Sequence, residues 1–560
     1  MSGSTFWLSV RRSFSEWVRA LLGESPSTRF TQALLAIALV TLAAQVSVMS
    51  SFIARNIATR AEIAAIDNDG GVAIGTATHT KLYDDNGWRP YGPLYYRLVR
   101  ILHHLGTHPH ATDSTSSDER IEMQNSRERS HHFLLAWVSL ISLVGLCALL
   151  ACLITTLPVY RVLLTSALLT AFTSHPTWAE MILRPHPDHL FAALIGLATW
   201  ASWKWLTAPQ AQARTRLILM GAAWGLAASC KMTVLVFAPG VIALFIGRRP
   251  IFDFRSLGTW MASALTTYLL VGFPQSFNFG GVIEFLLQQS KNVLPATWES
   301  IVNWLDLFAT QIWRPLAVVG LGLLFLSSPR TTAASRTMAL RLSLLVILPI
   351  AYLFSKKIIS PISWYPLPFI AAILAALVLG TNGLRSRWAA WTNWTHRWPA
   401  QLGAWILIPF FYQGVPSTWN QALAEQQRCR AEARRVEAQV NAAAQAGGHI
   451  LVDPYIPYSQ IFHDREVEMA WEMRLDRIRP DTKLIALKSE YYRWYLPVDS
   501  GGSGGAVLHI QNLEPVREFY LKFWQQTKAM DPLGREWRKV YDDACTFEIW
   551  APVLADPDRP

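Results

Sequence analysis

Eleven apolar stretches, separated by mostly short polar segments, run from residue 33 to residue 414. The clearest is Ala33 to Ile53, because about 20 apolar residues rising ~1.5 Å each cross a hydrocarbon core of ~30 Å. The pattern predicts about eleven membrane-spanning helices, although its shorter stretches could also be buried or re-entrant segments. The other stretches lie near 132–157, 161–174, 188–206, 216–230, 232–246, 257–273, 315–327, 341–355, 364–380 and 401–414.

Composition supports a membrane protein. Hydrophobic residues make up 51% of the chain and charged residues only 16%, which is too little charge to coat a soluble protein of this length. The 25 tryptophans suit the boundary between hydrocarbon and headgroups. We therefore interpret the formal charge of +11 as a mark of membrane topology and expect no nucleic-acid partner.

The basic residues predict the orientation. With the N-terminus in the cytosol, the cytosolic segments hold 17 Lys or Arg and the short outer loops hold 6, as the positive-inside rule requires. Arginines precede the first span and no small-residue cleavage site follows it, which indicates an uncleaved helix. Eleven spans then place the C-terminus outside. The predicted divisions are a cytosolic segment 1–30, a transmembrane domain 31–414 and an extracytoplasmic domain 415–560.

Two long polar segments fall on the outer side. The first, 54–131, contains an amphipathic stretch from Tyr91 to Leu105 that should lie flat in the membrane interface. The second, 415–560, reads as a small α/β domain. Its predicted elements are a helix at 421–445, strands at 449–452 and 483–487, a helix at 514–530 and a closing strand at 546–550.

The cysteines and the sequence motifs indicate which covalent bridge and which cofactors to expect. Cys429 and Cys545 both fall in the predicted outer domain, where an oxidising compartment would let them form a disulfide. No HExxH, CxxC, Walker or dinucleotide-binding pattern occurs in the right context. We therefore expect no metal and no nucleotide cofactor.

An acidic pair follows the first span. Asp67 and Asp69 precede the flexible pair Gly70-Gly71, and two carboxylates at a membrane surface could serve as a general base and its partner. The same residues also fit a turn that caps the next helix.

Four cations lie at the outer ends of different predicted helices. Arg184 and Asp188 belong to the sequence Arg184-Pro185-His186-Pro187-Asp188, in which Asp188 could cap the next helix. Lys231 lies between two apolar segments, and Lys356 and Lys357 precede Trp364-Tyr365-Pro366. Such cations could hold an anionic lipid headgroup. Alternatively, Lys231 could extend its ammonium group to lipid phosphates.

In this order the motifs resemble those of the GT-C membrane glycosyltransferases over about 31–380. The matching features are the acidic pair, Tyr91-Gly92-Pro93-Leu94-Tyr95-Tyr96, Arg184 to Asp188, Gly225-Leu226-Ala227 with Lys231, and Lys357 with Tyr365-Pro366-Leu367-Pro368. The chain departs from the family in its His186-Pro187 insertion and in having Asp67-Asn68-Asp69 where the family has an Asp-Glu pair.

The resemblance implies transfer of one sugar from a polyprenyl-phosphate donor to a lipid, glycan or protein acceptor on the outer face. Protein O-mannosyltransferases and lipid A aminoarabinose transferases work in this way. It implies a multi-pass protein of a bacterial-type inner membrane, with membrane lipids and the donor as partners. Asp67 would be the catalytic base and Asp69 its positioning partner. Substrate binding would fall to Tyr91, Arg184, Asp188, Lys231, Lys356, Lys357 and Tyr365.

Three other functions compete with a glycosyltransferase. A transporter or flippase would place ionisable residues within the spans and show inverted repeats, whereas here the charges gather at one surface. A lipid-linked polymerase or ligase would use diphosphate donors. A scaffold would use 54–131 and the C-terminal domain as docking surfaces.

Overall fold

The fold is mainly helical and ends in a six-stranded sheet. It is a computed structural model. It describes residues 29–58, 92–95, 97, 98, 101, 136–152, 154, 155, 158–174, 187–246, 253–273, 275–277, 280, 283, 298, 302, 309, 313–325, 345, 415–453, 467–469, 473–489, 496, 514–523, 525–543, 545 and 547–553. Apart from Leu345, the predicted spans at 341–355, 364–380 and 401–414 lie outside these ranges, so the count of eleven stays a prediction.

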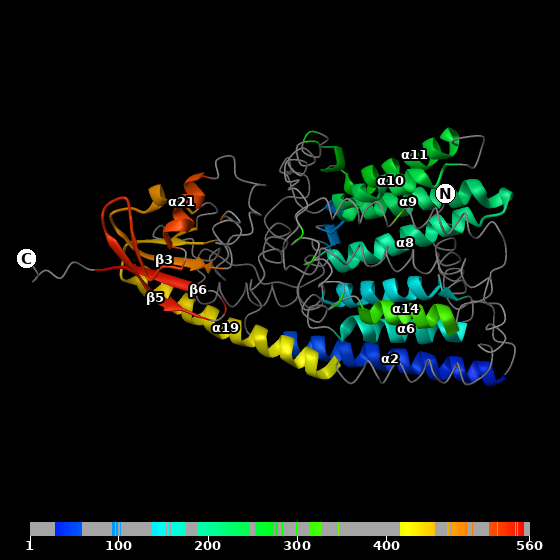
Figure 1. Cartoon of the computed structure of the whole chain (residues 1–560), viewed down its shortest axis with the longest axis horizontal. Coiled ribbons are helices and arrows are strands. Elements are labelled where there is room, and N and C mark those ends of the chain that lie inside the picture. Colours follow the sequence, from blue (N-terminus) through cyan, green and yellow to red (C-terminus); the bar gives the residue numbers. More distant parts are fainter. Residues whose placement is uncertain are drawn as a thin grey trace, which may run out of the picture.

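The helices of residues 29–325 lie side by side with similar axis directions and form the helical unit (Figure 1). They pack around two apolar clusters, one centred on α2, α6 and α14 and the other on α8, α9 and α10. The described members are α2 (Arg29–Ala58), a helix at Ala136–Cys152, α6 (Pro158–Thr173), α8 (Asp188–Leu206), α9 (Ala213–Cys230), α10 (Ala238–Ala243), α11 (Phe254–Gly272) and α14 (Trp313–Phe325).

Several helices of this unit are apolar on their exposed sides as well as on their packed sides. Val40 of α2 is 68% exposed and Leu270 of α11 is 71% exposed. A water-soluble bundle would place polar residues there, so these faces suit contact with hydrocarbon. Gln32–Ala54 is the only described helix that is both long and apolar enough to cross a membrane by itself.

One end of the helical unit faces the C-terminal domain (Figure 1), and we call it the domain-facing end. At this end α2 and α6 finish and α19 (Val415–Gln445) begins: the rings of Phe52 and Trp419 lie 4.7 Å apart, and Trp419 Nε1 donates to Thr173 O at 3.0 Å. Arg161, Lys204 and Arg214 sit at helix ends on the opposite side. These three basic residues therefore lie at the end away from the C-terminal domain.

The segment 232–246, which the sequence predicts as one span, is not a regular helix. It consists of the 3-10 helix η2 (Met232–Phe237) followed by the six-residue α10. It nevertheless returns the chain to the opposite end, where the ring of Phe245 lies 4.9 Å from that of Trp205.

The C-terminal domain is a mixed sheet with strand order β2-β1-β3-β6-β5-β4. The first three strands of this order are parallel and the remaining pairs are antiparallel. Helices α19 and α21 (Glu514–Phe523) pack against it. The strands are β1 (His449–Val452), β2 (Val467–Met469), β3 (Thr482–Lys488), β4 (Lys528–Met530), β5 (Glu536–Asp542) and β6 (Phe547–Pro552).

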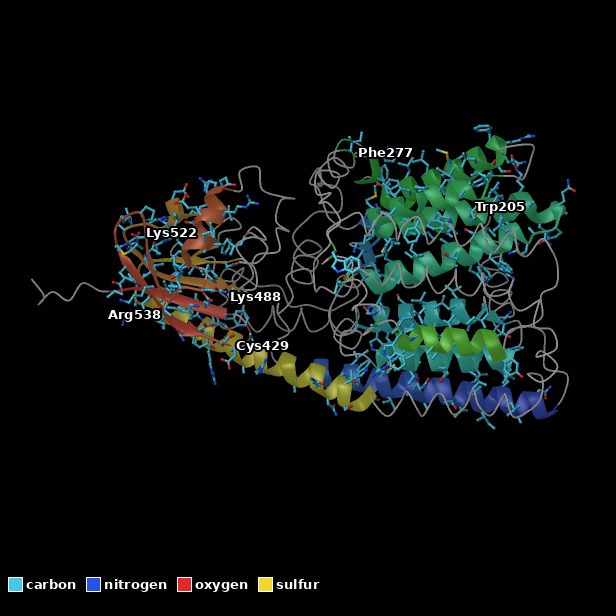
Figure 2. The ribbon with its side chains drawn as sticks, viewed as in Figure 1. Trp205, Phe277, Cys429, Lys488, Lys522 and Arg538 are labelled. Atoms are coloured by element: carbon cyan, nitrogen blue, oxygen red, sulfur yellow. A yellow bond between two sulfur atoms is a disulfide. The ribbon has the colours of Figure 1, made fainter. Side chains whose placement is uncertain are left out.

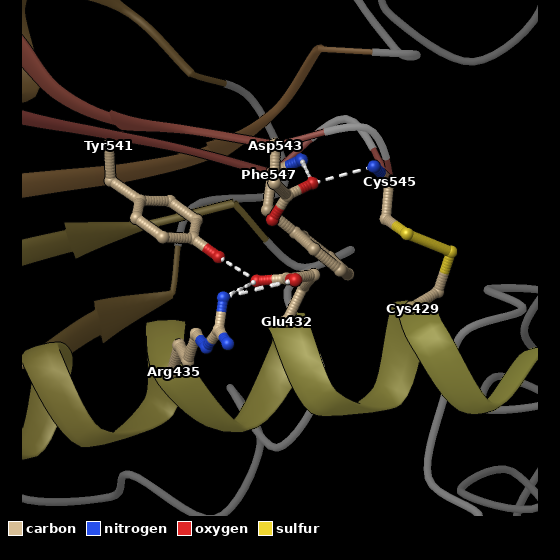
Figure 3. The surroundings of a disulfide bond; sticks show 7 residues. All are labelled: Cys429, Glu432, Arg435, Tyr541, Asp543, Cys545 and Phe547. Carbon is tan, nitrogen blue, oxygen red and sulfur yellow. Dashed lines mark hydrogen bonds and ion pairs between the residues drawn. A yellow bond between two sulfur atoms is a disulfide. The ribbon is translucent and has the colours of Figure 1, made fainter.

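The disulfide predicted between Cys429 and Cys545 is confirmed, with Cα atoms 5.2 Å apart. It joins α19 to the turn that precedes β6 (Figure 3). Beside it, Glu432 of α19 accepts hydrogen bonds from Tyr541 and Arg435. The bridge therefore fixes α19, whose first turns pack on the helical unit, to the sheet.

Two predicted helices have different bounds. The helix expected at 421–445 begins earlier, at Val415, and its 31 residues extend from the helical unit to the domain. The helix expected at 514–530 ends at Phe523, because Gln525 adopts a left-handed conformation with φ 53°. Residues 528–530 form strand β4 instead.

Candidate functional site

Asp188 and Lys231 form a buried ion pair at the domain-facing end. Lys231 Nζ lies 2.6 Å from Asp188 Oδ1, and the two side chains are 7% and 0% exposed. The residues are 43 positions apart, at the start of α8 and immediately after α9. Two of the motifs identified in the sequence therefore meet.

The backbone explains how each charge is placed. Helix α9 ends at Cys230, and Lys231 is extended with φ −155° and ψ 127°, so its side chain leaves the helix direction. Asp188 is the first residue of α8. The N-cap position belongs to Pro187, and no side chain caps this helix. The prediction that Asp188 caps α8 is therefore wrong, because its carboxylate instead accepts from Lys231.

The motif segment that begins at Gly92 packs against the same turn. Gly92 N donates to Cys230 O at 2.8 Å. A Cβ at Gly92 would lie 2.2 Å from Ser229 O, so only glycine allows this approach. A Cβ at Gly272, the last residue of α11, would lie 2.9 Å from Pro93 Cγ, and Arg97 donates to the carbonyl of Val271. The start of the predicted interfacial stretch is therefore held against the ends of α9 and α11.

Glycines of α9 bring it close to α11. A Cβ at Gly225 would lie 2.4 Å from Ala264 O, and one at Gly221 would lie 2.7 Å from Trp260 O. Small residues four positions apart allow helix backbones to approach closely in membranes. The glycine of the Gly225-Leu226-Ala227 motif thus positions the helix that ends directly before Lys231.

A second polar group lies at the domain-facing end, and the sequence analysis missed it. Arg314 of α14 donates to Ser174 O at 2.8 Å and to its hydroxyl at 2.9 Å. Thr418 of α19 donates to the same carbonyl at 3.2 Å. These groups satisfy carbonyls at the end of α6. The sequence feature that could have identified this group is that Arg314 directly precedes the apolar stretch 315–327.

The sequence groups Lys231 with other cations, whereas the structure shows it in an ion pair with Asp188. Its ammonium group has a carboxylate partner and is buried, so the alternative in which it extends to lipid phosphates is wrong. The other predicted site residues lie outside the described ranges: Asp67, Asp69, Tyr91, Arg184, Lys356, Lys357 and Tyr365. Within the described ranges, no three His, Cys, Asp or Glu side chains gather as metal ligands.

A buried carboxylate beside an ammonium group has defined chemical capabilities. Each charge offsets the desolvation of the other. The carboxylate also fixes the direction of one N–H of the ammonium group. The ammonium group can then present positive charge to an anion that arrives at the domain-facing end.

Two solved structures are similar to the chain over most of its length. No protein-family model and no curated sequence matches the chain. The chain is similar to ArnT from Cupriavidus metallidurans bound to undecaprenyl phosphate, with 11% identity and a TM-score of 0.49 over 95% of this chain and 99% of that one. It is also similar to apo ArnT from the same organism, with 12% identity and a TM-score of 0.49 over 84% and 94%.

Proposed function

We propose that this chain is a membrane glycosyltransferase that moves a single sugar from a polyprenyl-phosphate donor to a lipid, glycan or protein acceptor at its domain-facing end. The supporting observation is the buried pair of Asp188 and Lys231 beneath the docked motif of the first outer loop. A charge pair at a membrane surface next to a closely packed loop suits an anionic lipid substrate.

In the proposed reaction, the acceptor hydroxyl attacks the anomeric carbon of the donor sugar and the bond to the donor phosphate breaks. Asp67 takes the hydroxyl proton as general base, with Asp69 positioning it. Lys231 stabilises the negative charge that develops on the departing polyprenyl phosphate. Asp188 holds the ammonium group in place for this step and does not itself contact the reacting atoms.

Charge placement favours an enzyme over a transporter. Asp188 and Lys231 are the buried carboxylate and ammonium group among the described residues of the helical unit, and both lie at helix ends. Deep in this unit the polar contacts are neutral, such as that from Gln45 Nε2 to Thr170 Oγ1 at 2.8 Å. Transporters place ionisable groups near the midplane instead.

The direct test is to incubate the purified full-length protein with a panel of radiolabelled polyprenyl-phosphate sugars. One member should release polyprenyl phosphate when acceptor is present. Asp67→Asn should lower this rate by a factor on the order of 10²–10⁴. Asp69→Asn should cost less, since Asn still forms turns and caps. Full activity in Asp67→Asn would reject it as the base, and no release with any donor would reject the proposal.

We also propose that the C-terminal domain and the domain-facing end lie outside the cytosol. The support is that Arg161, Lys204 and Arg214 lie at the end away from the C-terminal domain, because cytosolic segments carry the excess of basic residues. A reporter fused after Pro560 should be active only outside the cytosol, and one inserted near Arg249 only inside. The reverse pattern would invert the proposed topology.

A further inference from the structure

The carboxyl end of α6 is held by side chains from two other helices. Trp419 of α19 donates from Nε1 to Thr173 O at 3.0 Å, and Thr418 of α19 donates to Ser174 O at 3.2 Å. Arg314 of α14 donates to the same oxygen of Ser174 at 2.8 Å. The last carbonyls of a helix have no partner within it, so α19 and α14 complete the end of α6. We call these five residues the α6 joint.

The joint is firmly attached on the side of α19. Trp419 is 3% exposed and belongs to the apolar cluster around α2, α6 and α14. Its ring meets that of Phe52 edge-on, with ring centres 4.7 Å apart. Pulling the first turns of α19 away would leave a buried indole N–H without an acceptor, which costs free energy. These turns therefore move together with α6.

The later turns of the same helix are fixed to the C-terminal domain. Cys429 is bridged to Cys545, Glu432 accepts from Tyr541, and side chains of α19 are buried against β1, β3 and β6. Cys429 lies where α19 meets the domain (Figure 2). Only ten positions of continuous helix separate it from Trp419, which is about 15 Å. A change in the position of the domain is therefore passed along α19 to the α6 joint.

The joint also begins the segment that leads to the proposed site. Segment 175–187 starts directly after Ser174 and ends directly before Asp188, the partner of Lys231. The predicted substrate residue Arg184 belongs to this segment. One end of the segment is thus held by the α6 joint and the other by the buried ion pair, so a shift of the joint acts on the position of Asp188.

A hydrogen bond that only completes a helix end looks different. At the end of α8, Thr207 donates to Trp203 O at 2.9 Å, a contact within four positions. The α19 donors of the α6 joint come from 244 and 246 positions away. Since a helix end can be completed locally, its completion by the helix that carries the domain favours a second role.

We propose that Thr418 and Trp419 are positioning residues through which the C-terminal domain is coupled to donor binding at Asp188 and Lys231. The inference rests on the proposed function for the identity of the ligand. Coupling between two sites is reciprocal. An intact joint should therefore raise the affinity for polyprenyl phosphate, and bound polyprenyl phosphate should restrict the position of the domain. A joint that only completes α6 predicts neither effect.

The test uses the full-length protein in detergent, with polyprenyl phosphate as the ligand and without acceptor. Thr418→Val and Trp419→Phe together remove both α19 donors but keep apolar side chains of similar shape. Thr418→Ser retains the hydroxyl group. Thr207→Val is the matched control, because it removes a hydroxyl-to-carbonyl bond at the opposite end of the helical unit.

The position of the domain is measured as the distance between two spin labels. The labels are attached to Arg538→Cys in the domain and Gln210→Cys between α8 and α9, both at exposed positions. Figure 2 shows Arg538 in the domain and Trp205, near the end of α8, on the far side of the helical unit. The free cysteines Cys147, Cys152 and Cys230 are buried, so labelling is confined to the two introduced residues.

In the wild-type protein, saturating polyprenyl phosphate should narrow the distribution of distances between the labels. The double variant should bind polyprenyl phosphate about fivefold or more weakly and should lose this narrowing. Thr418→Val alone, which leaves Trp419 in place, should show a smaller loss of affinity. Thr418→Ser and Thr207→Val should behave like the wild type.

Two results would overturn the coupling and leave the proposed function standing. One is wild-type affinity and narrowing in both the double variant and Thr418→Val, and the other is an equal loss of affinity in Thr207→Val. A wild-type protein that does not bind polyprenyl phosphate would instead reject the proposed donor, and the coupling with it.

Discussion

The helical unit and the C-terminal domain bury charge in different ways. In the helical unit, Asp188 and Lys231 are brought together from adjacent helices at one end of an apolar bundle. In the C-terminal domain, the carboxylate of Asp531 is surrounded by donors: Arg535 Nε at 2.7 Å, Trp537 Nε1 at 2.9 Å, and the backbone of Leu533 and Arg535 at 2.9 Å.

The difference separates two uses of a buried carboxylate. Four donors around Asp531 close the turn between β4 and β5, and this arrangement stabilises the fold. The pair in the helical unit lies beside the packed segment that begins at Gly92, where it can attract an arriving anion. The following experiments should show whether this distinction holds.

Breaking the pair in the helical unit should have the largest effect. Lys231→Met leaves a buried carboxylate without its ammonium partner, so we expect destabilisation by roughly 3–5 kcal/mol and loss of donor binding. Combining Lys231→Met with Asp188→Leu should restore most of the stability, because a buried pair can often be replaced by apolar side chains. Thermal unfolding and donor affinity are the measurements.

The double variant decides between a structural and a functional pair. It should be stable but unable to bind donor. Wild-type donor affinity in a stable double variant would show that the pair serves only the fold. Glu514→Gln is the control, since it removes an exposed ion pair with Arg517 and should change stability by about 1 kcal/mol or less.

Removing the disulfide should lower the stability of the C-terminal domain by a similar amount. The bridge spans 116 residues, and closing a loop of this size restricts the unfolded chain by on the order of 4 kcal/mol in the chain-entropy model. Replacing Cys429 and Cys545 by Ser should therefore lower the unfolding temperature of the C-terminal domain. Cys147→Ser, at a buried free thiol, is the control for a lost sulfur. An unchanged domain transition would contradict the prediction.

These two regions also differ in how well the sequence predicts them. Long apolar runs predict α2, α8, α9 and α11, because their lengths alone carry the signal. Strands β2 and β4 have three residues each, too few to show alternation, and β5 is rich in polar residues because much of it is exposed.

The candidate site, too, could be predicted only in part from the sequence. The sequence identifies Asp188 and Lys231 as separate features and places Lys231 among cations. It cannot show that they pair, because the contact joins residues 43 positions apart and depends on how α8 and α9 pack. It also cannot show the role of Gly92, since only the packed structure reveals the backbone of Ser229 beside it.

Gly92→Ala tests whether the packed loop matters to the pair. The added Cβ would lie 2.2 Å from Ser229 O, so the loop must move, at a cost of about 1–3 kcal/mol. We expect transfer to slow more than donor binding weakens. Gly145→Ala and Gly258→Ala are matched controls, because nothing lies within 4 Å of either added Cβ. Normal transfer in Gly92→Ala would show that the docking does not position the first outer loop.

The smallest effect should come from acidification, and it should be confined to the C-terminal domain. Burial, together with the charge of Arg479, lowers the pKa of His449, so its ring is neutral near neutral pH. Burial acts to raise the pKa of Glu468, but hydrogen bonds from Arg477 and His449 outweigh it and the pKa is lowered.

Both shifts predict lower stability in acid. In the unfolded chain, His449 takes up a proton near its usual pKa of about 6.5 and Glu468 near about 4.3, whereas in the folded domain each does so at lower pH. The unfolded state therefore binds more protons as the pH falls below about 6.5, and the free energy of unfolding decreases. Glu468→Gln should reduce this dependence below about pH 5, as measured by the domain's unfolding temperature. His449→Gln should reduce it between about pH 7 and pH 5. An identical pH dependence in the wild-type protein and in both variants would show that His449 and Glu468 titrate alike in the folded and unfolded states. The hydrogen bonds of His449 and Glu468 would then not account for the domain's sensitivity to acid.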